Sequence, residues 1–136
     1  MRWAVVDSSV YIDHWERGLR DDVLNNVRRE FIVRHSAIVL SELRRGARTR
    51  EARRLVDGLF RLAKVQWTPS TSDWWEAGTL VRTIGDTESW DEQKRRSFQN
   101  DALLALTARR HGATVVTADR DFEPLGRALS IALRFV

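Results

Sequence analysis

Runs of consecutive apolar residues alternate along the chain with longer segments in which apolar residues recur at helical spacing. A continuous apolar run indicates a strand that is buried on both faces, as in a parallel sheet. The clearest such run is Thr114-Val115-Val116-Thr117, and Trp3-Ala4-Val5-Val6 is of the same kind. Strands are predicted at 3–6, 37–40, 64–67, 114–117 and 131–133.

Helices are predicted between these strands from the apolar spacing and from residues that favour helix ends. Ser41 would cap one helix, the polar cluster 70–73 would cap another, and Gly112 would end the last. The polar stretch 85–96 is predicted to be a loop. The predicted helices are 8–16, 21–30, 42–47, 51–62, about 70–84 and 100–111.

This alternation predicts a three-layer α/β/α sandwich, with helices on both faces of a parallel sheet. A chain of 136 residues suits one compact domain. No internal repeat, low-complexity tract or flexible linker divides the sequence, which has only 2 Pro and 7 Gly. A single domain over 1–136 is therefore expected.

The composition excludes several kinds of site and location. A chain without cysteine has no disulfide and no thiolate metal site, and its three histidines show no ligand spacing. No apolar stretch approaches the roughly 18 residues that cross a bilayer. The N-terminal apolar run is too short for a signal peptide. No membrane partner is expected, and the cytoplasm is the default location.

The charge of the chain favours a polyanionic partner. The net charge is +4, the isoelectric point is near 10.5, and all but two of the 23 basic residues are arginine. The planar guanidinium group binds phosphate through paired hydrogen bonds. A bias toward arginine can also reflect the base composition of a genome, so the charge alone does not decide the function.

Four acidic residues that are far apart in the sequence are expected to meet at one edge of the sheet. Asp7 follows the first strand, Glu42 opens the helix after the second, and Asp119 lies just beyond the fourth. Asp101 lies in the first turn of the predicted helix 100–111, which would run antiparallel to the strands. All four would therefore lie at the carboxyl edge of the sheet, where open parallel sheets bind their ligands.

Carboxylates that lie close together resist joint ionisation, because each raises the pKa of the others. Mg²⁺ or Mn²⁺ would relieve the repulsion, since these hard cations bind one or two carboxylates, water and phosphate oxygens. A bound ion can activate water for phosphodiester hydrolysis. Each acid alone could instead cap a helix or complement its dipole, and Asp121 is an alternative to Asp119.

Four segments in this order carry a resemblance to a known family. They are Val5-Val6-Asp7-Ser8-Ser9, Ser41-Glu42-Leu43, Asn100-Asp101-Ala102-Leu103-Leu104-Ala105 and Val116-Thr117-Ala118-Asp119-Arg120-Asp121-Phe122. They resemble the motifs of the PIN domain, over nearly the whole chain. In length and motif order the chain is similar to the VapC toxins of bacterial VapBC toxin–antitoxin pairs.

The resemblance implies a Mg²⁺-dependent endoribonuclease with a parallel sheet of about five strands between helices. It matches Asp7 and Asp101 to the most direct metal ligands and Glu42 and Asp119 to the other two acids. It also implies a homodimer and a cognate VapB-type antitoxin that blocks the acidic groove. Promoter DNA would be bound only through the complex with the antitoxin.

Other residues near the motifs are weaker candidates for the site. The resemblance matches Thr117 to a hydroxyl near the metal and Asn100 to a group that contacts the metal ligands and not the metal itself. A tryptophan can stack on an RNA base and a basic residue can hold a phosphate. The candidates for RNA contact are Arg44, Arg45, Lys94, Arg95, Arg96 and Trp90. Core packing or a solvated charged face is the alternative for each, and one of Trp74 and Trp75 is expected to face a partner.

Two other functions remain open at this point. One is a DNA-directed or flap-type nuclease with the same acids, and the other is an RNA-binding PIN module without catalysis. A haloacid-type phosphatase is disfavoured because Asp7 is followed by Ser8 and Ser9 rather than by a second Asp. A receiver-like domain is disfavoured because the only lysines, Lys64 and Lys94, do not fit its pattern.

Overall fold

The computed structural model describes residues 1–17 and 21–136 and contains a single five-stranded sheet in those residues. Every strand pair is parallel, and the strand order is β3-β2-β1-β4-β5. The strands are β1 Arg2–Val6, β2 Phe31–Ser36, β3 Gln66–Trp67, β4 Thr114–Thr117 and β5 Leu133–Phe135. Both edges of the sheet are short, since β3 has 2 residues and β5 has 3.

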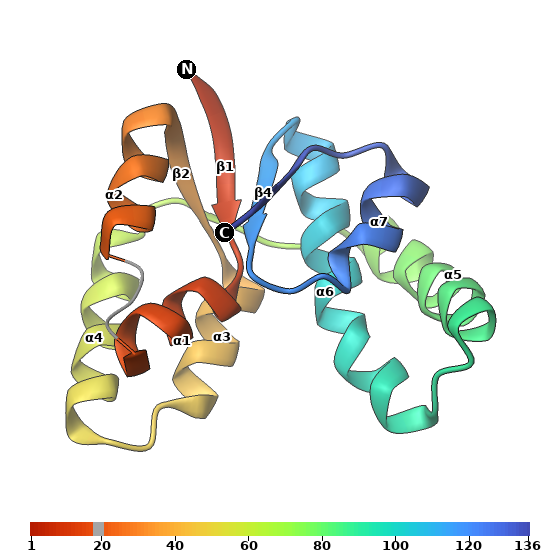
Figure 1. Cartoon of the computed structure of the whole chain (residues 1–136), viewed down its shortest axis with the longest axis horizontal. Helices are drawn as coiled ribbons and strands as arrows, with labels where there is room; N and C mark the ends of the chain where they lie inside the picture. Colours follow the sequence, from red (N-terminus) through yellow and green to blue (C-terminus); the bar gives the residue numbers. More distant parts are fainter. Residues whose placement is uncertain (18–20) are drawn as a thin grey trace.

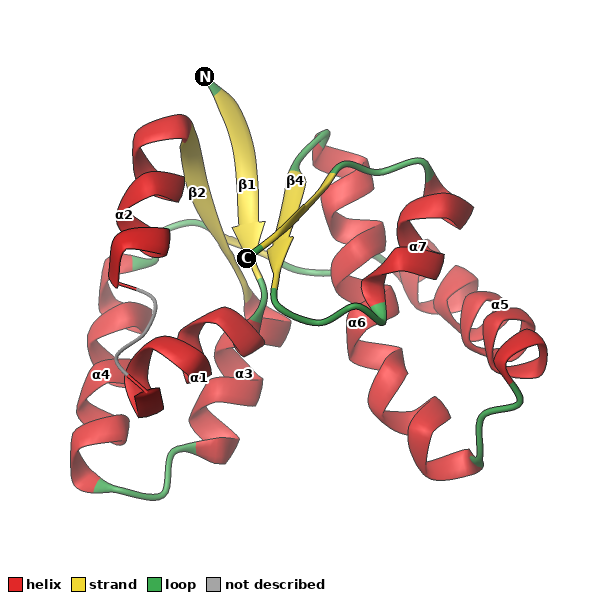
Figure 2. Cartoon of the chain, viewed as in Figure 1, coloured by secondary structure: helices red, strands yellow, loops and turns green. Residues whose placement is uncertain are grey.

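Helices cover both faces of this sheet, which confirms the predicted three-layer α/β/α architecture. Figure 1 shows α1 to α4 on one side of the strands and α5 to α7 on the other, and Figure 2 shows the strands between the two groups. The helices are α1 Ser8–Arg17, α2 Asp21–Glu30, α3 Ala37–Gly46, α4 Arg50–Leu62, α5 Thr71–Glu88, α6 Glu92–His111 and α7 Phe122–Leu129.

The order of the strands reverses between β1 and β4, which lie side by side although more than 100 residues separate them. Val6 is paired with Val116, and the Asp7 N–H continues the ladder by donating to the Val116 carbonyl at 2.8 Å. From β1 the chain moves outward to β2 and β3, then crosses to β4 and β5 on the other side. The carboxyl ends of β1 and β4 therefore meet at the switch point where such sheets bind ligands.

The core lies on both faces of the two central strands. Val5, Val115 and Val116 are completely buried. Every residue of α6 from 102 to 108 is also buried, because this part of the helix lies among the sheet, α5 and α7. A helix that is buried all round is apolar on every side. No helix in the described parts of the chain is both long and apolar enough to span a membrane.

The predicted strand at 37–40 is wrong, because these residues form the first turn of α3. The strand is instead β2, which ends at Ser36, and the Ser36 hydroxyl caps α3 by accepting the Ile38 N–H at 3.1 Å. Val39 and Leu40 are buried on the inner side of the helix. A run of four apolar residues fits a buried helical turn as well as a strand, so its pattern could not separate the two.

The predicted loop at 85–96 is also wrong, because α5 continues to Glu88 and α6 begins at Glu92. The polar residues of this stretch belong to the exposed faces of a helical hairpin. The Arg95 guanidinium group packs directly against Gly85, where a Cβ atom would lie 3.0 Å from the guanidinium carbon. The turn itself uses Ser89 in the left-handed region, with φ of 57°. The last strand also begins two residues later than predicted, at Leu133.

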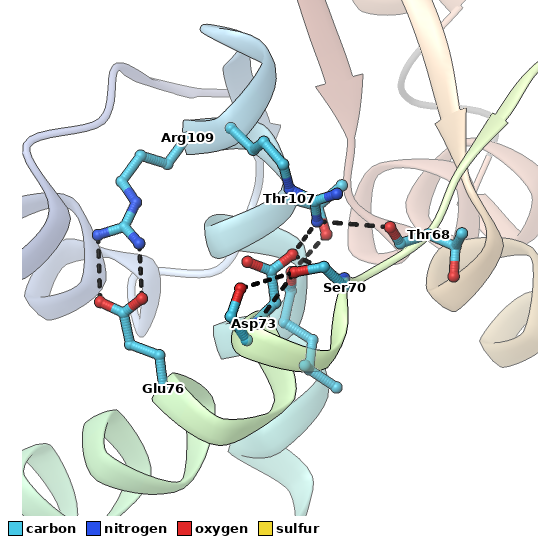
Figure 3. Close-up of polar contacts among 9 residues, drawn as sticks. Thr68, Ser70, Asp73, Glu76, Thr107 and Arg109 are labelled. Carbon is cyan, nitrogen blue, oxygen red and sulfur yellow. Dashed lines mark hydrogen bonds and ion pairs between the residues drawn. The ribbon is translucent and has the colours of Figure 1, made fainter.

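Two ion pairs fasten the start of α5 to the end of α6 (Figure 3). Asp73 is buried; its carboxylate accepts the Ser70 N–H at 3.0 Å and forms an ion pair with Arg110. Glu76 and Arg109 form a second, two-pronged pair at 2.6 and 3.2 Å. The Ser70 hydroxyl completes a capping box by accepting the Asp73 N–H. These contacts hold the two longest helices together at one end.

Replacing Asp73 by alanine is expected to lower the free energy of unfolding by about 2–3 kcal/mol. The substitution removes a helix cap and leaves the Arg110 guanidinium without its buried partner. Glu76→Gln is the matched control, since the pair with Arg109 is about 40% exposed on each side and should be worth less than about 1 kcal/mol. Urea denaturation of both variants tests the difference, and equal losses would contradict it.

Candidate functional site

Asp7 lies at the carboxyl end of β1, and its carboxylate is buried at the centre of a hydroxyl network. One carboxylate oxygen accepts the Ser9 hydroxyl at 2.7 Å and the Thr117 hydroxyl at 3.0 Å. Burial raises the pKa of Asp7 above its usual value, and the hydrogen bonds from Ser9 and Thr117 oppose this rise. The two hydroxyl groups therefore hold the carboxylate in place and favour its charged form.

The same network positions the end of β4. Thr117 is fully buried, and its hydroxyl oxygen accepts the Asp119 N–H at 3.0 Å. The Ser9 hydroxyl oxygen accepts the Ala118 N–H at 3.1 Å. The turn after β4 is thus tied to the start of α1 next to Asp7. As a consequence, Asp119 is presented at the same edge of the sheet.

Glu42 and Asp101 face the same space from α3 and α6. Burial raises the pKa of Glu42, and the negative charge of Asp7 raises it further, against hydrogen bonds from Asn100 and Ser8. Burial raises the pKa of Asp101 to about 8, with further contributions from the charges of Asp7, Asp119 and Glu42. All four predicted acids therefore contribute to one electrostatic cluster, and Asp101 lies where their repulsion is strongest.

The predicted reason for the position of Asp101 is wrong in one respect. Helix α6 begins at Glu92, so Asp101 lies in its third turn and not in its first. It still reaches the carboxyl edge, because the first half of α6 projects beyond the ends of the strands (Figure 2). Glu42 likewise lies inside α3 and does not open it.

Asp121 is engaged in a different interaction from Asp119. Its carboxylate forms an ion pair with the Lys94 ammonium group, and its N–H donates to the Asp119 carboxylate at 2.9 Å. The ion pair with Asp121 raises the pKa of Lys94, to which the charges of Asp119 and Asp101 contribute. Of the two alternatives, Asp119 is therefore the acid whose charge acts on Asp101, and Asp121 holds a cation beside the cluster.

The donor set fits a hard divalent cation. Every candidate ligand is a carboxylate oxygen, and the buried cluster has an unfavourable excess of negative charge. In the described residues no three His, Cys, Asp or Glu side chains already form a closed set around one point. Mg²⁺ does not require such a set, since it commonly binds one or two carboxylates and keeps several waters.

The remaining candidates differ in how they are placed. The negative charge of Glu42 is opposed by the nearby charge of Arg45, whereas Arg44 lines a separate hollow between α3 and α4. Arg95 donates to the Trp90 carbonyl and pairs with Asp86, so it has a structural role in the hairpin. The exposed Arg96 pairs only with Glu92 of its own helix among the described residues.

Trp90, Trp74 and Trp75 lie in different surroundings. Trp90 lies between α5 and α6 and packs edge-on against Phe98, with ring centres 4.6 Å apart. The Lys94 ammonium lies 5.3 Å from the centre of the Trp90 ring. Trp74 and Trp75 are both exposed, at 49% and 85%. Their sequence position excluded a shared core, and the structure places neither of them in it.

The hydroxyl groups of Ser8 and Ser9 were not predicted as site residues. Both belong to the first turn of α1, directly after Asp7, and both bond to carboxylates of the cluster. The signal was present in the sequence, because a helix that starts directly after a strand turns its first side chains back toward the strand end.

Comparisons with known proteins identify the family and the fold. The family model described as the PIN domain matches residues 4–128. No curated protein matches the chain. Among solved structures, the chain is similar to one from VapBC2 of Rickettsia felis bound to a DNA fragment from their promoter. The TM-score is 0.70 at 20% identity, and 98% of each chain is covered.

Two further solved structures are similar over nearly the whole chain. One is VapBC-5 from Mycobacterium tuberculosis, with a TM-score of 0.64, 22% identity and 100% of each chain covered. The other is VapBC-1 from nontypeable Haemophilus influenzae, with a TM-score of 0.68 at 16% identity, covering 98% of this chain and 97% of that one. At this level of identity the likeness shows a shared fold.

Proposed function

This chain belongs to the PIN domain family, and from that premise we propose that it is a Mg²⁺-dependent endoribonuclease, the toxin of a type II toxin–antitoxin pair. The observation that carries the proposal is the crowding at Asp101, whose pKa is raised to about 8 by burial and by three other carboxylates. A buried group of this kind requires a proton or a cation. At neutral pH a bound cation would neutralise the carboxylates, which stabilises the fold, and would also be available for a reaction on phosphate.

Asp7 and Asp101 would be the most direct ligands, with Glu42 and Asp119 completing the acidic set. Ser9 and Thr117 orient Asp7 by donating their hydroxyl groups to one of its carboxylate oxygens. When bound, Mg²⁺ or Mn²⁺ would supply a Lewis acid for the phosphate and a more acidic water molecule. Asn100 supports the arrangement by donating to Glu42.

Lys94 is the best placed of the candidates for RNA contact. It is partly exposed, lies beside the acidic cluster and is paired with Asp121. Arg45 lies near Glu42, and the Trp90 ring packs against the Lys94 ammonium group. We assign weaker roles to Arg44, Arg95 and Arg96, whose contacts lie within the helices or away from the acids.

A groove beside the acids suits the antitoxin that this proposal requires. It lies among α1, α3 and α4 and reaches Glu42 at one end. Its apolar lining includes Ile12 and Leu55, which are 41% and 40% exposed. An amphipathic segment of a VapB-type antitoxin could cover both this lining and the acids. We further propose that the protein forms a homodimer, binds promoter DNA only through the antitoxin complex and acts in the cytoplasm.

Cleavage assays with matched nucleic acids test the proposed function. We expect the protein to cut a structured RNA in the presence of Mg²⁺ or Mn²⁺ and not in EDTA, and to leave DNA of the same sequence intact. Equal cleavage of the DNA would favour a DNA-directed or flap-type nuclease. If neither substrate is cut and calorimetry detects no Mg²⁺ binding, the chain is a binding module without catalysis.

A further inference from the structure

The outward face of α4 carries a concentrated positive charge. Positions separated by three, four or seven residues lie on the same side of a helix. On α4 this spacing places positions 50, 53, 54, 57 and 61 on one exposed side. Position 57 is an aspartate and the other four are arginines. The four basic residues, Arg50, Arg53, Arg54 and Arg61, are termed the α4 arginine stripe.

The fold does not neutralise this stripe. Arg53 donates only to main-chain carbonyls, those of Thr49 at 3.2 Å and Arg48 at 3.4 Å. Among the described residues, no ion pair involves Arg50, Arg54 or Arg61, and none involves the neighbouring Asp57. At this spacing Arg50 repels Arg53 and Arg54, whereas Asp57 attracts the arginines on either side of it. One acid among four arginines leaves this face with an excess of positive charge.

The stripe faces outward because α4 is held by its opposite side. Val56 is buried and Leu59 packs against the core, and these residues lie across the helix from the arginines. The stripe and Asp57 together line a shallow hollow on the surface. Among the residues that the structure describes, no aromatic or aliphatic side chain lines this hollow.

The hollow of the stripe adjoins a second hollow between α3 and α4, which shares Asp57 and Arg61 with it and adds the basic side chain of Arg44. This second hollow and the groove that includes Glu42 lie on opposite sides of the contact between α3 and α4, and they share only the buried Val56. A ligand that contacts both the acids and the stripe must therefore be long enough to pass around this pair of helices.

We propose that the α4 arginine stripe binds the phosphate backbone of the substrate RNA at a distance from the bond that is cut. The inference rests on the proposed function and adds to it a second contact with the same substrate. Guanidinium groups suit phosphate, and an RNA duplex presents phosphates at regular intervals. A protein partner would need apolar or aromatic anchors, which this hollow lacks. A second copy centred on the stripe would oppose arginine to arginine.

Salt-dependent binding of RNA tests this inference. The variant Arg50→Gln/Arg54→Gln/Arg61→Gln is compared with Arg29→Gln/Arg82→Gln/Arg127→Gln, whose arginines are exposed on α2, α5 and α7. Both triple variants change the net charge from +4 to +1. Fluorescence anisotropy with a labelled RNA hairpin in EDTA measures binding without cleavage, and thermal melting checks that both variants are folded.

The stripe variant is expected to lose about 2 units from the slope of log K against log salt, corresponding to three lost phosphate contacts. The control variant should change this slope by less than about half a unit, because it removes charge without removing contacts. Equal slopes for the two variants would overturn the inference, even if the wild-type protein cuts RNA. Selective loss of binding in the stripe variant supports the inference even if no cleavage is found, in which case only the proposed function fails.

Discussion

Asp101→Asn is expected to lower the rate of Mg²⁺-dependent RNA cleavage by more than about 100-fold, since losing a residue that merely orients a metal ligand already costs about 10–100-fold. The amide keeps the size of the side chain but removes the negative charge on which the other three acids converge. The rate of RNA cleavage under single-turnover conditions measures the effect.

The matched control for this experiment is Asp22→Asn, which makes the same chemical change at an exposed position of α2. It should cleave RNA at the wild-type rate. Circular dichroism and thermal melting of both variants separate a loss of chemistry from a loss of fold. Cleavage by the Asp101→Asn variant at more than about a tenth of the wild-type rate would show that the acidic cluster is not the catalytic site.

The metal-free protein is expected to lose several kcal/mol of stability as the pH rises from about 4 to about 8, at about 1.4 kcal/mol per pKa unit. The pKa of Asp101 is about 8 in the folded chain and close to 3.8 when unfolded. Between these values the folded state binds the additional proton. The free energy of unfolding is therefore highest below this window and falls as the pH rises through it.

Urea denaturation in EDTA across this range measures the slope, and the same series with Mg²⁺ tests its cause. Mg²⁺ should restore most of the lost stability at high pH, because an ion that binds only the folded state stabilises it. Asp101→Asn should flatten the slope in EDTA and should gain little from Mg²⁺. A wild-type protein whose stability in EDTA is constant over this range would contradict the crowding of charge at Asp101.

The central part of the sheet and the acids attached to it could be predicted from the sequence. β4 and the second half of β1 are buried, and their residues are apolar except for the buried Thr114 and Thr117, so the pattern is unambiguous. The ends of these strands locate Asp7 and Asp119 directly. Predicting that they meet required only the general rule on where parallel strands end.

The peripheral elements could not be predicted as well, because their patterns fit more than one structure. β2 is buried at its two ends, Phe31 and Ser36, and only partly buried or exposed between them, and the continuous apolar run that follows it belongs to a helix. The hairpin between α5 and α6 has few apolar residues because it projects beyond the sheet. Asp101 was therefore assigned to the correct edge for a partly wrong reason.

The pairing of Lys94 with Asp121 could not be predicted from the sequence, for another reason. The two residues are 27 positions apart, Lys94 in the first turn of α6 and Asp121 just before α7, and their contact depends on how far α6 projects past β4. A distance of this kind is set by the packing of α5 on α6, which no local pattern encodes.

The shortness of the two outermost strands limits how another protein can recognise this chain. Strand addition by a partner needs a row of free main-chain N–H and C=O groups along an edge. Here β3 offers 2 residues and β5 offers 3, which is too little for a stable added strand. An antitoxin or a second copy must therefore read side chains on the helical surfaces. Specificity between partners would then be changed by substitutions on the helices, and the edges of the sheet would stay protected from aggregation.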